Sequence, residues 1–303
     1  MFKLVLLALA DKADGRAAAQ LASALAARHG AGFAVQHVSG PVGQEGGCVL
    51  HLPGEADLAA RRIEVEALLR EVMPPGLTAD IVLSAGFAHL EVLKTARILE
   101  PDLVVLGGLD ETERCRRELS ASQGSAAVLV ADGAPCPVLV VPSAADTQSG
   151  PFECVLTAVD LSEDTEQTRA QLDLAARLAA REGADLHVLH TLQLSLGHPT
   201  PGHDEMVRRI ATASDRLAYL CQGLPGADRI AFAVSEGAAS VELLKHARER
   251  KADLLILSRP SRNGEGQNDT LARVLEGARC PVLLLGPGAL AARQQNPAPA
   301  MRG

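Results

Sequence analysis

The sequence predicts an α/β fold of two tandem, doubly wound domains, each built on a five-stranded parallel sheet. Three observations support this prediction: short apolar runs alternate with helical patterns, the order of elements occurs twice, and particular phrases recur in both halves. The clearest repeat is APCPVLVV at 134–141, which returns as ARCPVLLL at 278–285. A chain of 303 residues with 47% hydrophobic content is long enough for two domains, each with its own core.

The first half opens with LVLLALA at 4–10, an apolar run too short for most helices, which predicts a strand buried on both faces. Although MFKLVLLALA has some features of a signal peptide, its apolar run is short and DKADGR follows without a typical cleavage site. The next stretch, RAAAQLASALAARHG, has apolar residues at helical spacing and ends at Gly30, a typical helix stop. GFAVQHV then predicts the second strand.

A long Gly-rich loop at 39–57 leads to a second helix, which is marked by Val65, Leu68, Leu69 and Val72 and ended by MPPG. After it, ADIVLSA, HLEVLKTARILE and DLVVLG predict a strand, a helix and a strand. A polar loop and a short Ala/Val segment precede PVLVV, which predicts the fifth strand. Strands and helices therefore alternate throughout the first half.

The second half repeats this order, beginning with CVLTAVD, the helix LDLAARLAAREG and DLHVLHT. The helix that follows is expected to carry Val207, Ile210, Ser214, Leu217 and Cys221 on one face. RIAFAVS, VELLKHARER, DLLILS and PVLLL complete the set. Recurrence of the whole order predicts an internal duplication.

Alternation of strands and helices implies right-handed β-α-β crossovers and a parallel sheet that is covered on both faces. Ligands of such sheets bind beyond the carboxyl ends of the strands, at a topological switch point. The predicted domains span 1–144 and 151–290, and a flexible tail is expected at 291–303.

Composition argues against several classes of partner. The formal net charge of −8 does not suit a general nucleic-acid binder, because phosphate backbones are held by clusters of Lys and Arg. An aromatic content of 2% offers no base-stacking platform. No apolar run reaches the roughly 18 residues of a membrane span, and the cysteines form no C-x-x-C pair. We expect a cytoplasmic protein with no nucleic-acid or membrane partner.

Four features taken together resemble the universal stress protein family: an apolar strand ending in Asp, the phrases SAGFAHLEV and SEGAASVEL before the third helix, the strands DLVVL and DLLIL, and the terminal CPV strands. The resemblance covers nearly the whole chain, as two tandem domains. It implies a five-stranded sheet of the adenine nucleotide alpha hydrolase-like kind and a last strand that pairs across a dimer interface. The two CPV strands of this chain would then pack the domains as an intrachain pseudo-dimer, and further association into a homodimer stays open.

The CPV phrase has a physical basis for this pairing. Pro137 and Pro281 can begin a strand or stand on an edge, and an exposed apolar edge needs a partner. A simpler interpretation, a helix stop followed by a core strand, is compatible with it. Cys136 and Cys280 are expected to be buried spacers, because neither has an evident activating neighbour in the sequence.

Nucleotide-binding members of the family resemble one another in a G-x2-G-x9-G-[ST] motif after the fourth strand and in an Asp that ends the first strand and contacts the nucleoside. Glycines let the backbone approach phosphates, and helix amides hold them. In the first half, Gly107, Gly124 and Ser125 fit this motif, but Asp110 replaces the second glycine and Ala10 takes the acidic position. The resemblance therefore implies a degraded site in which these three residues are the candidate contacts of ATP or AMP.

The stretch between Asp110 and Gly124 leaves two interpretations open. Arg114, Arg116 and Arg117 could supply charge to a bound anion. Alternatively, neighbouring glutamates balance them in a solvated polar loop.

In the second half, Asp160 ends the first strand as the resemblance implies and is the fourth candidate contact. Ser258, Ser261, Asn268 and Asp269 stand where Gly, Gly, Gly and Ser are expected. A carboxylate about 4 Å from a phosphate costs on the order of 4 kcal/mol at an effective dielectric constant of 20. We therefore predict no tight ATP binding in this half.

Other polar groupings in the sequence give weaker indications of a functional site. HPTPGHDE at 198–205 contains metal-ligand types, but nothing supplies an orienting partner, and no metal site is predicted. His37 and His190 end equivalent strands and are expected to satisfy local hydrogen bonds. The loops at 39–57 and 191–205 remain open as binding surfaces.

No G-x-S-x-G elbow, P-loop lysine or H-E-x-x-H motif occurs, and the polar residues at 160–164 suit a helix cap. We expect no enzymatic activity. The favoured function is a universal stress protein acting as a non-catalytic stress-response or regulatory module with an unknown protein partner. The alternatives are an ATP- or AMP-binding switch that uses the first-half site and an enzyme of the wider nucleotide-binding α/β group.

Overall fold

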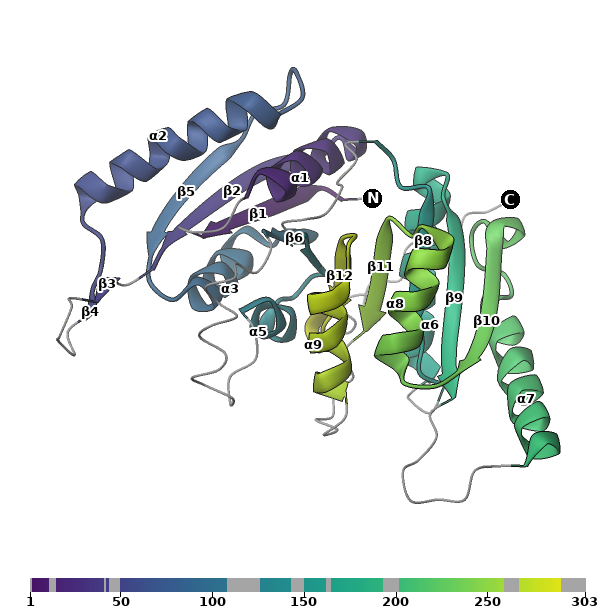
Figure 1. Ribbon diagram of the computed structural model, residues 1–303. Coiled ribbons are helices and arrows are strands. Elements are labelled where there is room, and N and C mark those ends of the chain that lie inside the picture. Colours follow the sequence, from purple (N-terminus) through teal and green to yellow (C-terminus); the bar gives the residue numbers. More distant parts are fainter. Residues whose placement is uncertain are drawn as a thin grey trace. The chain divides into compact units, whose positions relative to one another are not determined.

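The structure, a computed structural model, describes residues 2–10, 15–40, 42–43, 50–107, 126–142, 150–161, 165–192, 202–258 and 267–289. The chain divides into two compact units, Met1–Gly150 and Pro151–Gly303. Each unit is an α/β domain with a parallel sheet (Figure 1). The predicted fold class is therefore confirmed.

The sheet of the first unit has the strand order β7-β6-β1-β2-β5. Its strands are β1 (Leu4–Ala10), β2 (Gly32–Ser39), β5 (Asp80–Ala85), β6 (Leu103–Leu106) and β7 (Val138–Val140). The chain runs outward from β1 through β2 to β5, and then returns to the other side of β1 to form β6 and β7. The topological switch point therefore lies between β1 and β6, which are parallel neighbours.

Helices cover both faces of this sheet, as the direction of each right-handed crossover requires. The helices are α1 (Arg16–His29), α2 (Glu55–Val72), α3 (Ala88–Leu99) and α5 (Ala126–Gly133). α1 and α2 pack together on one face, and α3 and α5 pack together on the other (Figure 1). α1 ends as predicted at Gly30, whose φ of 61° lies in the left-handed region.

The second unit repeats this topology with the order β10-β9-β8-β11-β12. Its strands are β8 (Cys154–Ala158), β9 (Asp185–Leu192), β10 (Ile230–Glu236), β11 (Leu254–Ser258) and β12 (Val282–Leu285). Its helices are α6 (Thr165–Glu182), α7 (His203–Cys221), the short η1 (Ala227–Arg229), α8 (Ala239–Arg250) and α9 (Gln267–Gly277). The switch point lies between β8 and β11.

One aspartate in each unit ties two strand beginnings together. Asp102, just before β6, accepts hydrogen bonds at Oδ2 from the backbone N–H groups of Lys3 (2.6 Å) and Leu4 (3.0 Å). Asp253, just before β11, accepts from Glu153 at 2.7 Å and from Cys154 at 3.2 Å. These bonds fix the central strand of each sheet at its amino end, opposite to the ligand-binding edge.

The structure differs from the sequence-based prediction in two regions, the loop predicted at 39–57 and the helix α9. The loop predicted at 39–57 includes a short antiparallel pair, β3 (Val42–Gly43) and β4 (Leu50–His51), and the beginning of α2 at Glu55. α9 was not predicted, because its first turn contains Asn268 and Asp269, which were compared with the family's phosphate-binding motif. A helix can begin within such a polar stretch, since Asn and Asp are frequent near helix N-termini.

The predicted inner face of α7 is wrong in its first half. Val207 and Ile210 are 51% and 36% exposed, and the buried residues of the helix all lie between 213 and 221. The 19 residues of α7 span about 28 Å, whereas the seven residues of β10 span about 23 Å. The helix is thus longer than the strand on which it packs, and its first turns lack sheet beneath them.

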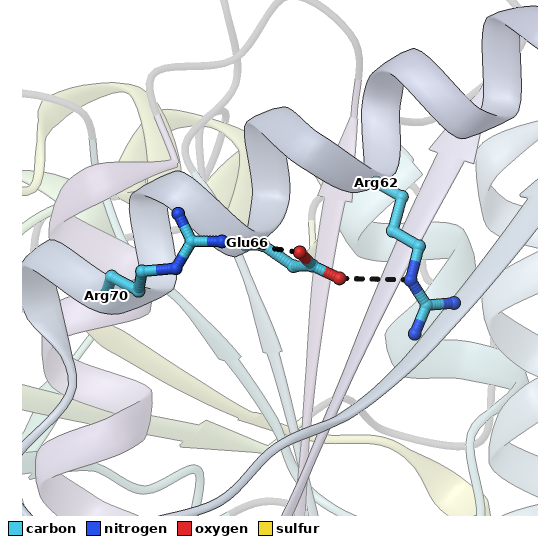
Figure 2. A network of polar contacts seen from close by, with 3 residues as sticks. All are labelled: Arg62, Glu66 and Arg70. Atoms are coloured by element: carbon cyan, nitrogen blue, oxygen red, sulfur yellow. Dashed lines mark hydrogen bonds and ion pairs between the residues drawn. The ribbon is translucent and has the colours of Figure 1, made fainter.

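The exposed side of α2 carries a row of ion pairs (Figure 2). Glu66 accepts from Arg62 at 3.0 Å and from Arg70 at 3.4 Å, with each partner one turn away. Exposed pairs at this spacing contribute only about 0.3–0.5 kcal/mol each. They mark a solvated helix face and indicate no binding site.

Candidate functional site

The switch point of the first unit is bordered by small residues. Gly107 directly follows β6, and Ala8 of β1 is the register partner of Leu106. A Cβ added to Gly107 would lie 3.7 Å from Cα of Gly15 and 3.8 Å from Cβ of Ala18, both at the start of α1. These are ordinary contact distances, so the end of β6 and the start of α1 meet through backbone and small side chains.

Two of the candidate nucleotide contacts in this unit lie outside the described residues, namely Gly124 and Ser125. Their relation to Gly107 stays a prediction. Among the described residues, Gly107 and the start of α1 are the elements that border this switch point.

In the second unit, Asp160 and Ser258 lie at the carboxyl ends of the two strands that flank the switch point. Ala158 and Leu257 are register partners, and Asp160 and Ser258 follow them closely in the chain. Asp160 is exposed and Ser258 is half-buried. The backbone carbonyl of Asp160 accepts from Thr168 Oγ1 at 3.4 Å. Asp160 was predicted to end the first strand of this half; β8 ends at Ala158, two residues earlier, and a contact of Asp160 with a nucleotide stays a prediction.

A buried hydrogen-bond network closes the floor of this crevice. Nε2 of Gln171, on α6, donates to Thr157 Oγ1 and to the Ala158 carbonyl, both at 2.8 Å. Thr157 Oγ1 donates in turn to the carbonyl of Ile256 at 3.0 Å. Gln171 and Thr157 are 1% and 0% exposed. The side chains of α6 thus satisfy strand-end groups that a ligand could otherwise use.

In the described part of the first unit, apolar residues stand at the positions equivalent to this network. Leu7 occupies the position of Thr157, since each is two residues beyond the equivalent valines that pair with Leu103 and Leu254. The helix ends ARHG and AREG align, which places Ala18 opposite Gln171 and Gly15 opposite Thr168. The crevice floor is therefore apolar and small in the first unit and polar and hydrogen-bonded in the second.

The sequence analysis did not identify Thr157 and Gln171. A signal was present, because Thr157 interrupts an apolar strand and Gln171 stands on the same helix face as Leu174 and Leu178. Polar residues on a core face must find partners inside the protein. Which partners they find could not be inferred, since the two residues come from different elements.

The start of α9 bears on anion binding in the second unit. α9 begins at Gln267, so Asn268 and Asp269 lie in its first turn. The sequence therefore places an acidic residue, and no glycine or serine, at this helix beginning. Ser261 lies outside the described residues.

The equivalent histidines have local roles. His190 is buried, and its Nδ1 lies 3.0 Å from the carbonyl of Val159. This contact confirms the predicted local hydrogen bond for His190. His37, in the equivalent position, is also buried.

The cysteines near the sheet termini are poor nucleophiles. Burial, and next the charge of Asp102, raise the pKa of Cys136 to about 12. Burial, and next the charge of Asp253, raise the pKa of Cys280 to about 12. The pKa of Cys154 is raised to about 11, chiefly by burial. The thiolate is the reactive form, so these thiols are structural, as the sequence predicts for Cys136 and Cys280.

We predict that Cys136 and Cys280 resist alkylation in the native protein at pH 7.5, because almost none of either thiol is ionised and Cys136 is also buried. Mass spectrometry of peptides after iodoacetamide treatment measures this directly. The same treatment in concentrated urea serves as the control and should modify both residues. Rapid native modification of either thiol would contradict the assignment.

The described residues contain neither a metal-ligand cluster nor a membrane-spanning helix. Within the described ranges, no three His, Cys, Asp or Glu side chains gather so that they could hold a metal ion. His203, Asp204 and Glu205 of the predicted HPTPGHDE grouping are exposed in the first turn of α7, and residues 198–201 lie outside the described part. None of the described helices is both long and apolar enough to span a bilayer.

Comparisons with known proteins agree with the fold. The sequence profile of the universal stress protein family matches residues 1–142 and again residues 151–286. A search of curated proteins finds no significant match. Among solved structures, a universal stress protein from Pseudomonas aeruginosa UCBPP-PA14 is similar with a TM-score of 0.66 and 17% identity, covering 96% of both chains.

Two further structures are similar over nearly their full length. A protein of unknown function from Pseudomonas aeruginosa PAO1 has a TM-score of 0.63 and 17% identity, covering 96% of this chain and 95% of its own. A universal stress protein from Archaeoglobus fulgidus DSM 4304 has a TM-score of 0.63 and 14% identity, covering 93% and 96%. At these identities the likeness establishes the fold alone.

Proposed function

The chain belongs to the universal stress protein family, and from this premise we propose that it is a non-catalytic stress-response or regulatory module with degraded nucleotide-binding motifs. Family membership supports the stress role. Its work would be done through contacts with a protein partner. The observation that best supports a degraded nucleotide site is the buried hydrogen-bond network of Gln171 and Thr157 at the second switch point.

At the second switch point, side chains of the protein itself form hydrogen bonds with the carbonyl groups at the strand ends. The Gln171 amide bonds the carbonyl of Ala158, and Thr157 bonds the carbonyl of Ile256. The first turn of α9 contains Asp269 where a phosphate would need a positive helix end. Occupied hydrogen-bond groups and a negative charge together disfavour a phosphorylated ligand in the second unit.

The same contacts support the absence of catalysis. A hydroxyl nucleophile needs a base within hydrogen-bond reach. The hydroxyl groups of Thr157 and Thr168 instead donate to backbone carbonyls. The hydroxyls of these two threonines are therefore held by structural bonds.

The second candidate function is an ATP- or AMP-binding switch in the first unit. The small residues Gly15, Ala18 and Gly107 around its crevice favour this alternative, because they let a ligand approach the backbone. The charge argument from Asp269 does not apply in this unit. Hydrolysis of the nucleotide is not part of the proposal.

Thermal unfolding with and without millimolar Mg-ATP or AMP tests these two functions. Two smaller universal stress proteins have solved structures in complex with cAMP and with dAMP. We therefore include cAMP and dAMP as further probes. A ligand at 100 times its Kd adds about 2.7 kcal/mol of stability, enough to move Tm by several degrees. The regulatory module without nucleotide predicts no shift.

A shift that disappears in Gly124→Leu would instead support the first-unit switch. Gly54→Leu is a matched control for folding, because Gly54 precedes α2, outside the proposed site, and an added Cβ would meet only Asp57 Oδ2, at 3.9 Å. A shift that persists in Gly124→Leu but is lost in Thr168→Val would place a ligand in the second unit, contrary to both proposals.

We also propose that the two units pair through their last strands, β7 and β12. Each stands at one end of its unit's strand order and is apolar, which supports a need for a partner strand. The carbonyl of Pro137 and the N–H of Val141 bond β6, so the amides of Val138 and Val140 point away from it. Slow hydrogen exchange at these two amides is expected, and exchange as fast as in a free peptide would rule the pairing out.

A further inference from the structure

An open strip of sheet lies along β10, beside α8. α8 packs on β8 and β9, and its His246 Nε2 lies 2.8 Å from Ser235 Oγ at the end of β10. Because side chains alternate along a strand, Ala231 and Ala233 lie on the same face as Ser235. Ala231 is exposed and Ala233 is half-buried. The methyl groups of Ala231 and Ala233 therefore line an accessible strip of the sheet next to α8.

Three basic side chains border this strip. His187 of β9 is the register partner of Ala231 and shares its face. His246 and Arg250 are one turn apart on α8 and so project from the same side of the helix. Arg250 is exposed and forms no ion pair with any residue in the described part of the chain. A guanidinium and two imidazoles thus surround a floor of small apolar groups.

The pKa of His187 responds to charged groups on neighbouring elements. Burial and then Arg250 lower the pKa of His187; Asp185 opposes this effect, and His246 adds to it. Asp185, on β9, is already engaged, since its Oδ1 accepts from Arg229 Nε at 2.8 Å. His187 is therefore neutral at neutral pH, and the cluster gains positive charge as the pH falls.

The first unit shows that the fold does not require these groups. The alignment of GFAVQH with DLHVLH places Ala34 opposite His187. In the same way, LEVLKTARILE and VELLKHARERK place Thr95 and Leu99 opposite His246 and Arg250. All three basic residues are thus additions of the second unit, and they converge on one strip of its surface.

We propose that His187, His246 and Arg250 form a binding site for a small oxyanion, such as a phosphate group. Arg250 supplies a permanent charge and a fork of donors, and each imidazole supplies an N–H donor. The site lies over the edge strand and belongs to neither switch-point crevice, so it is independent of the proposed regulatory function.

NMR titration of the histidines in the full-length protein tests this site. Inorganic phosphate is the probe, and sodium chloride at matched ionic strength is the reference. Because an oxyanion favours the imidazolium form, phosphate should raise the pKa of His187 in a saturable manner, while chloride should not. Equal effects of the two salts would show screening alone and overturn the proposal, as would no effect of either.

Two variants separate binding from a structural role. Arg250→Gln removes a neighbouring cation, so the pKa of His187 should rise without phosphate, while the further rise on adding phosphate should be lost. Arg248→Gln is the matched control, because it removes an exposed arginine from another side of the same helix. A phosphate response that survives in Arg250→Gln, or that Arg248→Gln abolishes equally, would contradict the site.

The pH dependence of stability offers an independent readout. With a pKa lower in the folded than in the unfolded state, His187 reduces stability as the pH falls through the ordinary histidine range and the unfolded chain binds the proton first. Phosphate should reduce this loss by binding the protonated folded form. Identical acid-side stability curves with and without phosphate would contradict the proposal.

Discussion

Replacing Gln171 with alanine is expected to destabilise the second unit by about 2–4 kcal/mol, because it leaves a cavity and removes the partner of a buried carbonyl. The amide is 1% exposed and bonds both Thr157 and Ala158 at 2.8 Å. Alanine itself suits a helix, and Ala18 stands at the equivalent position of α1. The loss would therefore come from the network and not from the helix propensity.

Tyrosine fluorescence during urea unfolding measures this loss in the correct unit. The chain contains no Trp and one Tyr, and Tyr219 lies on α7 of the second unit. Circular dichroism follows both units together. Gln222→Ala, at an exposed position, is the control and should change stability by less than about 0.5 kcal/mol. A similarly small effect of Gln171→Ala would show that the network does not hold α6 on the sheet.

Replacing Asp253 alone with alanine is also expected to destabilise the second unit, by about 2–4 kcal/mol. Its carboxylate accepts two backbone hydrogen bonds, at 2.7 and 3.2 Å, and hydrogen bonds to charged groups contribute about 1.5–3 kcal/mol each. The desolvation of the carboxylate, which raises the pKa of Asp253, offsets part of that sum. The amino ends of β8 and β11 should separate most readily in this variant.

Asp102→Ala is the matched variant in the first unit, where the same carboxylate arrangement bonds Lys3 and Leu4. Asp253→Ala should shift the Tyr219 transition strongly, while Asp102→Ala should act mainly on the transition seen by circular dichroism. Asp253 uses both carboxylate oxygens, so Asn at this position retains one acceptor and should lose about half as much. Asp102 accepts both bonds at Oδ2, so Asn there can keep both and should lose less. Unchanged midpoints in both alanine variants would contradict a tethering role.

Most of the fold was predictable because the apolar strands and the repeated phrases reflect burial directly. β1 and β6, with their counterparts β8 and β11, are largely buried on both faces, which a continuous apolar run indicates. α7 was predicted less well, since periodicity shows which residues could face a sheet but not how far that sheet extends. α9 was missed because a Gly- and Asn-rich approach obscures where a helix begins.

The candidate sites were predictable only in part. The position of Asp160 at a strand end follows from the strand pattern, and the buried state of Cys136 follows from its apolar neighbours. In contrast, the bond from Gln171 to Thr157 and the approach of Arg250 to His187 join residues from separate elements. Such contacts depend on register and on helix rotation, which one sequence does not specify.

Calorimetric titration with Mg-ATP tests the central claim most directly, because it counts occupied sites in the full-length protein. A module with degraded nucleotide sites predicts no binding heat beyond dilution at millimolar nucleotide. A stoichiometry of one that is lost in Gly124→Leu would replace this function with the first-unit switch. A stoichiometry of two would contradict the closed second-unit crevice and with it the proposed loss of nucleotide binding.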